Sequence, residues 1–295
     1  MQGRTGVRPC MEVPMKLALI QMAAQTEKEA SLQLAESYIR KAAAEGADLA
    51  VLPEMFCCPY STENFPVYAE TEDGNCRARM AAAARENRIF LVAGSMPELD
   101  SEGHVYNTSY VFDREGRQIA RHRKVHLFDI NIEGGQYFRE SDTLSAGDQI
   151  TTFEIETTEK NRDGRSGTPL RCGLMICYDI RFPEFAMKMA QQGVSLIIVP
   201  AAFNMTTGPA HWELLFRARA LDDQVFMAGC SQARNTEAGG YISYGHSIIV
   251  SPWGEVLAQM DEKEGMIVQE IDLSATEKIR EQLPVLRQRR TDLYG

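Results

Sequence analysis

The sequence lacks the cysteine pattern of a disulfide-stapled or zinc-binding protein. Its seven cysteines are odd in number and include no Cys-x-x-Cys pair. Such a set indicates neither a disulfide framework nor a thiolate zinc site. We therefore expect reduced thiols and a cytoplasmic location.

Long apolar runs and excess positive charge are missing as well. No stretch approaches the about 20 apolar residues that a transmembrane helix needs, and the first fifteen residues lack the apolar core of a signal peptide. Lys and Arg number 31 against 41 Asp and Glu, a formal net charge of -10. Nucleic acids and anionic membranes bind basic surfaces, so the composition disfavours both as partners and favours a small-molecule substrate.

What the chain does have is apolar strands that alternate with helical patterns. Residues 16–22 and 48–53 are apolar on both faces, as expected for strands buried between layers. Between them, apolar residues recur at helical spacing until Gly46, and Thr26 with Glu29 resembles a capping box. This order predicts a β-α-β unit with parallel strands.

A short internal repeat in the sequence predicts two similar halves. Residues 46–56 and 193–203 share the order glycine, apolar strand, proline and short exit. We therefore expect an α/β fold with internal pseudo-symmetry, a four-layer α-β-β-α sandwich of two mixed sheets. No spacer rich in Pro, Gly or Ser separates the halves, so residues 16–295 are expected to form one domain after a disordered or extended lead-in, residues 1–15.

Two hairpins and two loops complete the expected elements. Residues 105–112 and 118–125 flank a turn sequence, and residues 247–260 contain another. Residues 126–150 are loop-like, and residues 158–168 form a polar insert that we expect on the surface.

Cys177 is the first candidate for chemistry. The apolar run before it predicts a strand, and Phe182-Pro183 predicts the start of a helix. The thiol would then lie at the carboxyl end of a strand, where α/β sheets bind ligands, beside a helix N-terminus that favours thiolate. Its position alone is equally compatible with a buried, inert cysteine.

A cysteine nucleophile needs a base. None of the five histidines can be linked to Cys177 by sequence, whereas Glu54 directly follows a wholly apolar strand and Pro53. A carboxylate there is either a costly buried group with a purpose or a solvated loop residue. Lys124 lies in the basic run of residues 121–126, which taken alone is typical of a solvated face.

Three segments together resemble the nitrilase superfamily of carbon–nitrogen hydrolases. They lie around Glu54, Lys124 and Cys177 and read Leu-Pro-Glu-Met-Phe, Arg-Lys-Val-His-Leu-Phe-Asp and Ile-Cys-Tyr-Asp-Ile-Arg-Phe-Pro-Glu. Further segments resemble its omega-amidase branch: residues 138–148, 202–213, 244–247, 251–255 and 284–294. The similarity extends from about Lys16 to Tyr294. The lead-in and residues 158–168 and 235–240 depart from the family pattern.

The resemblance implies a Glu-Lys-Cys triad of Glu54, Lys124 and Cys177, with Glu140 as an accessory fourth residue. Glu54 would act as base and then as acid, and a thioester would form on Cys177. Lys124 and the backbone N–H of Tyr178 would form the oxyanion hole. Neither a metal nor an organic cofactor is needed.

The branch implies hydrolysis of the terminal carboxamide of short dicarboxylate monoamides, α-ketoglutaramate and α-ketosuccinamate. Arg181 lies four residues after Cys177, so its guanidinium could bind the distal carboxylate or form a structural salt bridge. Phe203 and Thr207 match the pocket wall of the family. The alternatives are a deaminated-glutathione amidase, an N-carbamoyl-amine amidohydrolase and a catalytically silent binding module.

A homodimer is the expected assembly. The helix expected over residues 209–222 carries Trp212, Leu215 and Phe216, more apolar bulk than one side of a helix must bury, and the family associates through this region. The tail, residues 284–294, would lie across the partner.

Overall fold

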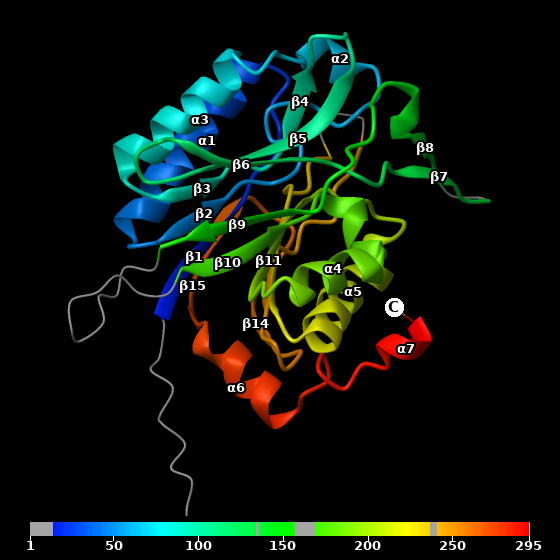
Figure 1. Ribbon diagram of the computed structural model, residues 1–295. Coiled ribbons are helices and arrows are strands. Elements are labelled where there is room, and N and C mark those ends of the chain that lie inside the picture. The colour runs from blue at the N-terminus through cyan, green and yellow to red at the C-terminus, as the bar shows by residue number, and fades with distance from the viewer. Residues whose placement is uncertain (1–13, 134–135, 157–168, 237–240, 295) are drawn as a thin grey trace, which may run out of the picture.

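The computed structural model describes residues 14–133, 136–156, 169–236 and 241–294, and shows two mixed β-sheets packed between helices (Figure 1). The first sheet has seven strands in the order β15-β1-β2-β3-β5-β4, with β6 paired to β5. These strands are β1 (Pro14–Gln21), β2 (Leu49–Val51), β3 (Phe90–Val92), β4 (Met96–Leu99), β5 (Val105–Phe112), β6 (Gln118–Arg123) and β15 (Gly265–Asp272).

The second sheet has six strands in the order β14-β13-β12-β11-β10-β9. These strands are β9 (Thr151–Ile155), β10 (Leu170–Leu174), β11 (Leu196–Ala201), β12 (Phe226–Ser231), β13 (Ile248–Val250) and β14 (Val256–Gln259). A separate two-stranded sheet joins β7 (Asp129–Asn131) to β8 (Tyr137–Arg139).

Helices lie on the outer faces of both sheets. The helices are α1 (Lys28–Ala44), α2 (Asn64–Tyr68), α3 (Asn75–Asn87), α4 (Pro183–Gln191), α5 (Gly208–Asp223), α6 (Ser274–Gln282) and α7 (Thr291–Tyr294), with the 3-10 helices η1 (Glu140–Asp142) and η2 (Cys177–Arg181). In Figure 1, α1 and α3 cover the first sheet, and α4 and α5 cover the second. Among the described residues, no helix is long and apolar enough to cross a membrane.

Successive side chains of the strands alternate between two hydrophobic clusters, and this alternation explains the layered packing. In β1, Leu17 and Leu19 join a core cluster that also contains residues of the second sheet, whereas Ala18 and Ile20 join the cluster beneath α1 and α3. Residues of β11 alternate in the same way between the inter-sheet core and the cluster beneath α4 and α5. Since successive side chains of a strand point to opposite faces, both sheets are buried on two sides. The predicted four-layer α-β-β-α sandwich is confirmed.

The two halves repeat the same β-α-β pattern. Strand β1 pairs parallel to β2, and β10 pairs parallel to β11. Gly46 and Gly193, which follow α1 and α4 at equivalent positions, have φ angles of +80° and +84°. Glycine adopts this left-handed conformation without the strain of a side chain, so each helix can end and turn directly into a strand.

Several local predictions need correction. Helix α1 begins at Lys28, and its N-cap, Glu27, makes no side-chain capping bond. The predicted capping box at Thr26 is wrong, because the hydroxyl of Ser31 instead accepts the backbone N–H of Gln25 at 2.8 Å. Strand β1 begins at Pro14, two residues before the predicted strand.

Both predicted hairpins form, as β5–β6 and β13–β14. Residues 126–150, predicted to be loop-like, contain β7, β8 and η1. The expected lead-in up to residue 13, the predicted surface insert at 158–168 and residues 237–240 of the segment 235–240 lie outside the described residues.

The apolar side chains of α5 that were expected to contact a second subunit are largely buried within the chain itself. Trp212 and Phe216 are 1% and 0% exposed, because they pack among the residues beneath α4 and α5. Leu215 is partly buried against the same cluster. The large apolar side chains that α5 exposes are Leu214 and Leu221.

Candidate active site

Cys177 lies in a tight connection between the second sheet and a helix. Strand β10 ends at Leu174, Cys177 is the first residue of η2, and α4 begins at Pro183. The φ angle of Cys177 is +46°, in the left-handed region that a residue with a side chain rarely adopts. The predicted strand-to-helix connection is present, with a 3-10 turn inserted before the helix.

The thiol of Cys177 is almost completely buried, with 5% of the residue exposed. Burial raises its pKa well above the usual value, and the negative charge of Glu54 raises it further, against the opposing effect of Lys124. Burial and the Glu54 carboxylate therefore both favour the neutral thiol. This direction is opposite to the one expected from a helix N-terminus, which would favour a thiolate.

Glu54 follows β2 and Pro53 and is fully buried. Its Oε1 accepts hydrogen bonds from Lys124 Nζ at 2.9 Å, Asn107 Nδ2 at 2.8 Å and the Tyr60 hydroxyl at 3.2 Å. Its Oε2 has no nitrogen or oxygen partner among the described residues. The solvated-loop alternative for Glu54 is thus wrong, and one carboxylate oxygen stays available for a proton.

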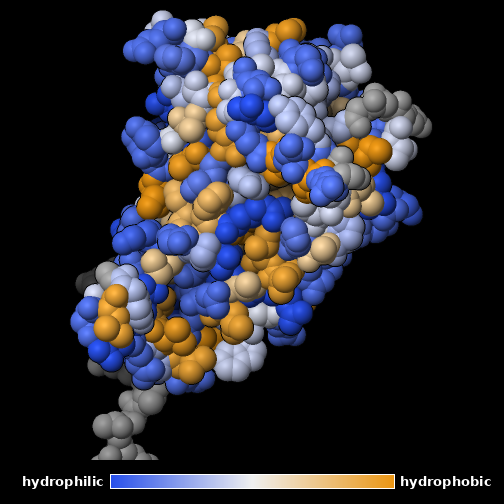
Figure 2. Space-filling view, turned by 90° about the vertical axis from the view of Figure 1, so that its right-hand side faces the viewer, coloured by the Kyte–Doolittle hydropathy of each residue, from blue (hydrophilic) through white to orange (hydrophobic). Residues whose placement is uncertain are grey.

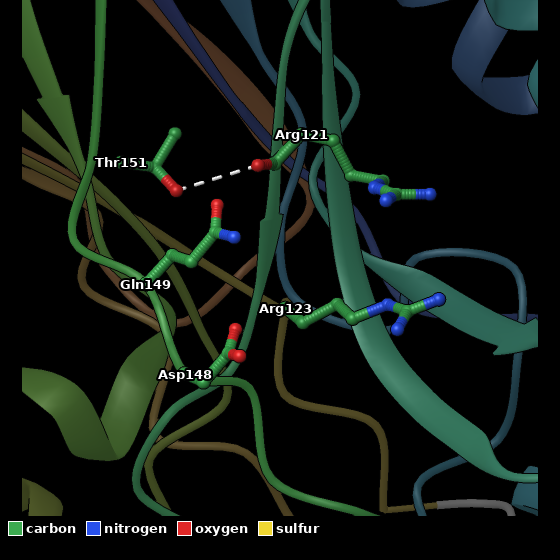
Figure 3. A pocket seen from close by; sticks show the side chains of 5 residues that line it. All are labelled: Arg121, Arg123, Asp148, Gln149 and Thr151. Atoms are coloured by element: carbon green, nitrogen blue, oxygen red, sulfur yellow. Dashed lines mark hydrogen bonds between the residues drawn. The ribbon is translucent and has the colours of Figure 1, made fainter.

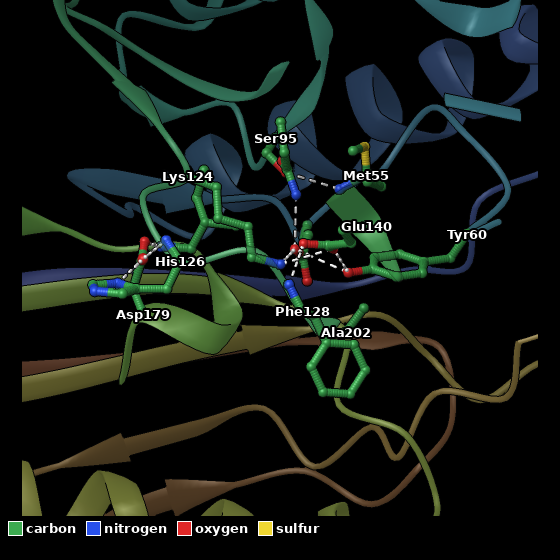
Figure 4. A network of polar contacts seen from close by, with 12 residues as sticks. Met55, Tyr60, Ser95, Lys124, His126, Phe128, Glu140, Asp179 and Ala202 are labelled. Carbon is green, nitrogen blue, oxygen red and sulfur yellow. Dashed lines mark hydrogen bonds and ion pairs between the residues drawn. The ribbon is translucent and has the colours of Figure 1, made fainter. Parts of the chain in front are cut away.

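Lys124 directly follows β6, and its side chain is fully buried. Its Nζ lies 2.9 Å from Glu54 Oε1 and 2.8 Å from Glu140 Oε1, as Figure 4 shows for Lys124 and Glu140. Burial alone would lower the pKa of Lys124, but the two carboxylates raise it above its usual value. The solvated-face interpretation of this lysine is therefore wrong.

Glu140, in the first turn of η1, is held on both oxygens. Oε1 accepts the Tyr60 hydroxyl at 2.6 Å as well as Lys124, and Oε2 accepts the backbone N–H of Phe128 at 2.8 Å. These contacts fix the carboxylate between Tyr60 and Lys124 (Figure 4). The two carboxylates of Glu54 and Glu140 thus share one ammonium group.

The pKa of Glu54 reflects this crowding. Burial raises it most, the negative charge of Glu140 raises it too, and the interactions with Lys124 and the Cys177 thiol partly offset the rise. A carboxylate with a raised pKa takes up a proton more readily at neutral pH, as a general base must.

A small pocket opens over the thiol, with an empty volume of about 180 Å³. It is lined by Phe128, Cys177, Tyr178, Arg181, Ala202, Phe203, Asn204, Thr207 and Tyr241. The structure thus brings Arg181, Phe203 and Thr207 beside Cys177, as predicted. The backbone N–H of Tyr178 lies in the first turn of η2, where helical N–H groups have no acceptor within the helix.

Arg181 carries the positive charge of this pocket. Its guanidinium lies 4.8 Å from the centroid of the Phe203 ring, and Nη1 lies 3.1 Å from His211 Nδ1. Its Nε is buried without a hydrogen-bond partner among the described residues. No carboxylate pairs with Arg181 among the ion pairs of the described residues, so the salt-bridge alternative has no partner there.

A larger polar pocket lies elsewhere, between β6 and the segment leading into β9 (Figure 3). Its lining residues are Arg121, Arg123, Asp148, Gln149 and Thr151. In Figure 3 both guanidinium groups point away from Asp148 and Gln149. They hydrogen-bond the buried Glu98 instead, at 3.3 Å and 2.7 Å. The residues that line this pocket include no cysteine, whereas Cys177 lines the smaller one.

Sequence reasoning missed Tyr60 and Asn107. Both are held against Glu54, but neither lies in a pattern that distinguishes it from an ordinary loop or strand residue. Asn107 lies 53 residues after Glu54, and Tyr60 lies 80 residues before Glu140, its second partner. Contacts over such separations leave no local pattern in the sequence. No group of three or more His, Cys, Asp or Glu side chains placed to bind a metal occurs within the described ranges.

Comparison with known proteins identifies the family of the chain. Residues 16–281 match the carbon–nitrogen hydrolase family. The chain is 48% identical to omega-amidase NIT2 of Xenopus tropicalis and 46% identical to that of Homo sapiens, in each case over 281 residues that cover 95% of this chain and 96% of the relative.

A solved structure agrees as well. Nit3 of Saccharomyces cerevisiae, a member of branch 10 of the nitrilase superfamily, superimposes with a TM-score of 0.82 at 39% identity, covering 97% of this chain and all of that one. The family resemblance of the sequence and the predicted fold class are both confirmed. The chain belongs to the carbon–nitrogen hydrolase family, within the nitrilase superfamily.

Proposed function

We propose that this enzyme hydrolyses the terminal carboxamide of short dicarboxylate monoamides, α-ketoglutaramate and α-ketosuccinamate, to the acid and ammonia. The observation that carries the proposal is one pocket of about 180 Å³ that contains both Cys177 and Arg181. The two omega-amidase relatives support the same class of amide.

In the proposed reaction, Glu54 removes the thiol proton as the sulfur of Cys177 attacks the carboxamide carbon. The raised pKa of Glu54 and its Oε2 atom, which contacts no nitrogen or oxygen of the described residues, suit this transfer. Glu54 then returns the proton to the departing amine, so ammonia leaves and a thioester remains. Water activated by Glu54 attacks the thioester, and the acid and the free thiol are released.

The negative charge that develops on the amide oxygen needs donors. We assign this role to the Lys124 ammonium and the backbone N–H of Tyr178, each contributing about 3–4 kcal/mol of transition-state stabilisation. Glu140 would hold Lys124 in place and orient the substrate amide, since its Oε1 lies 2.8 Å from Lys124 Nζ.

Arg181 would bind the carboxylate at the far end of the substrate. Among the described residues no carboxylate pairs with it and its Nε has no hydrogen-bond partner, so its guanidinium, which lies over the Phe203 ring, can donate to a substrate carboxylate. Phe203 and Thr207 would contact the carbon chain between the two ends.

A substrate panel tests the function directly. Released ammonia would be measured for the two ω-amides, a carbamoyl amine and deaminated glutathione, with wild type and Cys177→Ala side by side. The proposal expects turnover of the ω-amides by wild type and none by Cys177→Ala. Preferred turnover of deaminated glutathione or the carbamoyl amine would overturn the substrate assignment, and no ammonia from any member would favour a binding module.

We further propose that the enzyme is a homodimer that pairs through α5 and the tail over residues 284–294. Leu214 and Leu221 of α5 are 66% and 50% exposed, and Leu293 and Tyr294 of the tail are 69% and 58% exposed. Figure 2 shows the face at the right of Figure 1, where orange side chains lie among blue ones over the lower half. Burying these apolar side chains against a second copy would remove them from water.

A cytoplasmic location is also part of the proposal. All six described cysteines are free thiols, including Cys57 and Cys76, whose sulfur atoms lie 3.4 Å apart without a covalent bond. Reduced neighbouring thiols are typical of proteins in a reducing compartment.

A further inference from the structure

The side chain of Asp179 is fully buried two residues after Cys177, and the proposed reaction does not use it. Four donors surround its two oxygens. Oδ1 accepts the backbone N–H of His126 at 2.9 Å and lies 2.8 Å from His126 Nδ1. Oδ2 accepts the backbone N–H of Ile176 at 3.0 Å and lies 3.1 Å from His122 Nε2. Figure 4 shows Asp179 beside His126, next to Lys124.

These donors belong to two separate parts of the molecule. Ile176 immediately precedes Cys177, after a strand of the second sheet, whereas His122 and His126 lie two residues before and two residues after Lys124, at the end of a strand of the first sheet. The Asp179 carboxylate therefore links the segment that carries Cys177 to the segment that carries Lys124.

The link acts on a backbone that would otherwise relax. The φ angle of Cys177 is +46°, and a residue with a side chain is held in this region only when its surroundings determine it. The bond from Ile176 N–H to Asp179 fixes the backbone directly before Cys177. The bond from His126 N–H fixes the segment directly after Lys124.

We propose that Asp179 is a positioning residue that keeps Cys177 and the N–H of Tyr178 in register with Lys124 during amide hydrolysis. The inference rests on the proposed function. It adds to that function a residue that sets the geometry of the site without touching the substrate. An error of about 1 Å in such geometry costs roughly a hundredfold in rate.

Aspartate is the side chain that these bonds require. Each oxygen accepts a backbone N–H, from His126 on one side and Ile176 on the other. An asparagine has a single oxygen, so in either orientation its NH₂ group faces a backbone N–H. A histidine ring can change its tautomer, but a backbone N–H is always a donor. Asp179→Asn therefore leaves one buried N–H without an acceptor although the volume hardly changes.

The histidines offer a matched pair of variants. His126 contacts Asp179 through Nδ1, and the Nδ2 atom of asparagine occupies a similar place on the side chain, so His126→Asn retains a donor to Oδ1. His126→Leu has no donor. Both variants lose the ring that stacks on Phe182 with centroids 3.7 Å apart, so the difference between them isolates the bond to Asp179.

The experiment measures kcat and KM for an ω-amide with wild type, Asp179→Asn, His126→Asn, His126→Leu and Cys177→Ala, with each folded fraction determined by circular dichroism. A positioning role predicts that kcat per folded molecule falls roughly a hundredfold in Asp179→Asn while KM changes less than threefold. It also predicts that His126→Asn retains at least five times the kcat of His126→Leu.

A purely structural role would lower the melting temperature of Asp179→Asn and leave kcat per folded molecule within twofold of wild type, which overturns the inference. If Asp179→Asn does not fold, the histidine pair decides, and equal kcat values for His126→Asn and His126→Leu overturn it. A separate outcome would refute the proposed function itself. If Cys177→Ala still released ammonia, that function would be wrong regardless of the results for the Asp179 and His126 variants.

Discussion

The Nζ atom of Lys124 lies 2.9 Å from Oε1 of Glu54, and both side chains are fully buried. The same ammonium lies 2.8 Å from Oε1 of Glu140, so one positive charge faces two carboxylates without solvent. A buried ion pair contributes little over an apolar pair of the same shape, but removing one partner leaves a charge that nothing compensates. The stability of this site therefore depends on the whole set.

Lys124→Met tests that dependence. It leaves Glu54 and Glu140 facing each other in the interior, so we expect the free energy of unfolding to fall by about 3–5 kcal/mol and ammonia release to be lost. Urea denaturation at neutral pH measures the stability.

The double variant Lys124→Met/Glu54→Gln serves as the control. It removes one of the two opposed negative charges, so part of the stability should return while the enzyme stays inactive. If Lys124→Met alone were as stable as wild type, Lys124 could not be the ammonium that compensates the buried carboxylates of Glu54 and Glu140.

The positions of the strands could be predicted from the sequence, whereas the burial and contacts of the residues at the strand ends could not. Apolar runs such as residues 16–22 and 48–53 are compatible with few places in a fold, so the layered sandwich follows from them. Lys124, in contrast, lies in a run with Arg121 and Arg123 whose charges indicate a solvated face. The run is divided in the structure because side chains alternate along a strand: the arginines reach Glu98, and Lys124 is buried beside Glu54.

Long-range contacts limited the prediction of the site. The resemblance to a known family identified Glu54, Lys124 and Cys177, but Tyr60 and Asp179 hold these residues through contacts that no spacing reveals. The ionisation of Cys177 was predicted wrongly for the same reason. A helix N-terminus can be inferred from sequence, whereas the burial that raises the pKa of the thiol depends on the packing of both sheets.

Glu140→Gln tests the pKa of the base. The negative charge of Glu140 raises the pKa of Glu54, which burial already holds above the ordinary 4.5. In the proposed mechanism the ionised carboxylate is the base, so the acidic limb of kcat/KM in wild type should lie above pH 4.5. Removing the charge of Glu140 lowers the pKa of Glu54, so in Glu140→Gln the limb should move to lower pH.

The measurement is kcat/KM against pH for one ω-amide between pH 4 and pH 9. The limb belongs to the interacting group of Glu54, Lys124 and Cys177, so only its direction of movement is diagnostic. A limb that moves to higher pH in Glu140→Gln would contradict the assignment of Glu54 as the base. Glu133→Gln, which removes an exposed glutamate, is the control and should leave the limb in place.

The proposed dimer can be tested on α5. Leu214→Glu and Leu221→Glu place charges on exposed apolar positions, so each should shift the protein toward a monomer without unfolding it. Light scattering at micromolar concentration gives the mass, and circular dichroism checks the fold. Val67→Glu changes a 77% exposed valine on α2, away from α5, and should stay dimeric. A monomeric wild type would refute the dimer.

Arg181→Met tests how the pocket selects its substrate. If Arg181 binds the distal carboxylate through charge-assisted hydrogen bonds, the variant should lose about 1.5–3 kcal/mol of transition-state stabilisation for a charged ω-amide. That corresponds to roughly ten- to a hundredfold in kcat/KM. A neutral amide of the same length has no carboxylate to lose, so its kcat/KM should change far less.

The control for Arg181→Met is His211→Ala. His211 Nδ1 lies 3.1 Å from Arg181 Nη1, so this variant removes a neighbour of the guanidinium but leaves its charge in the pocket. It should keep the preference for the charged amide. If Arg181 instead served only to hold η2 in place, Arg181→Met would depress the charged and neutral amides equally and lower the melting temperature. Equal losses would therefore remove Arg181 from the binding site and favour an amidase for uncharged aliphatic amides.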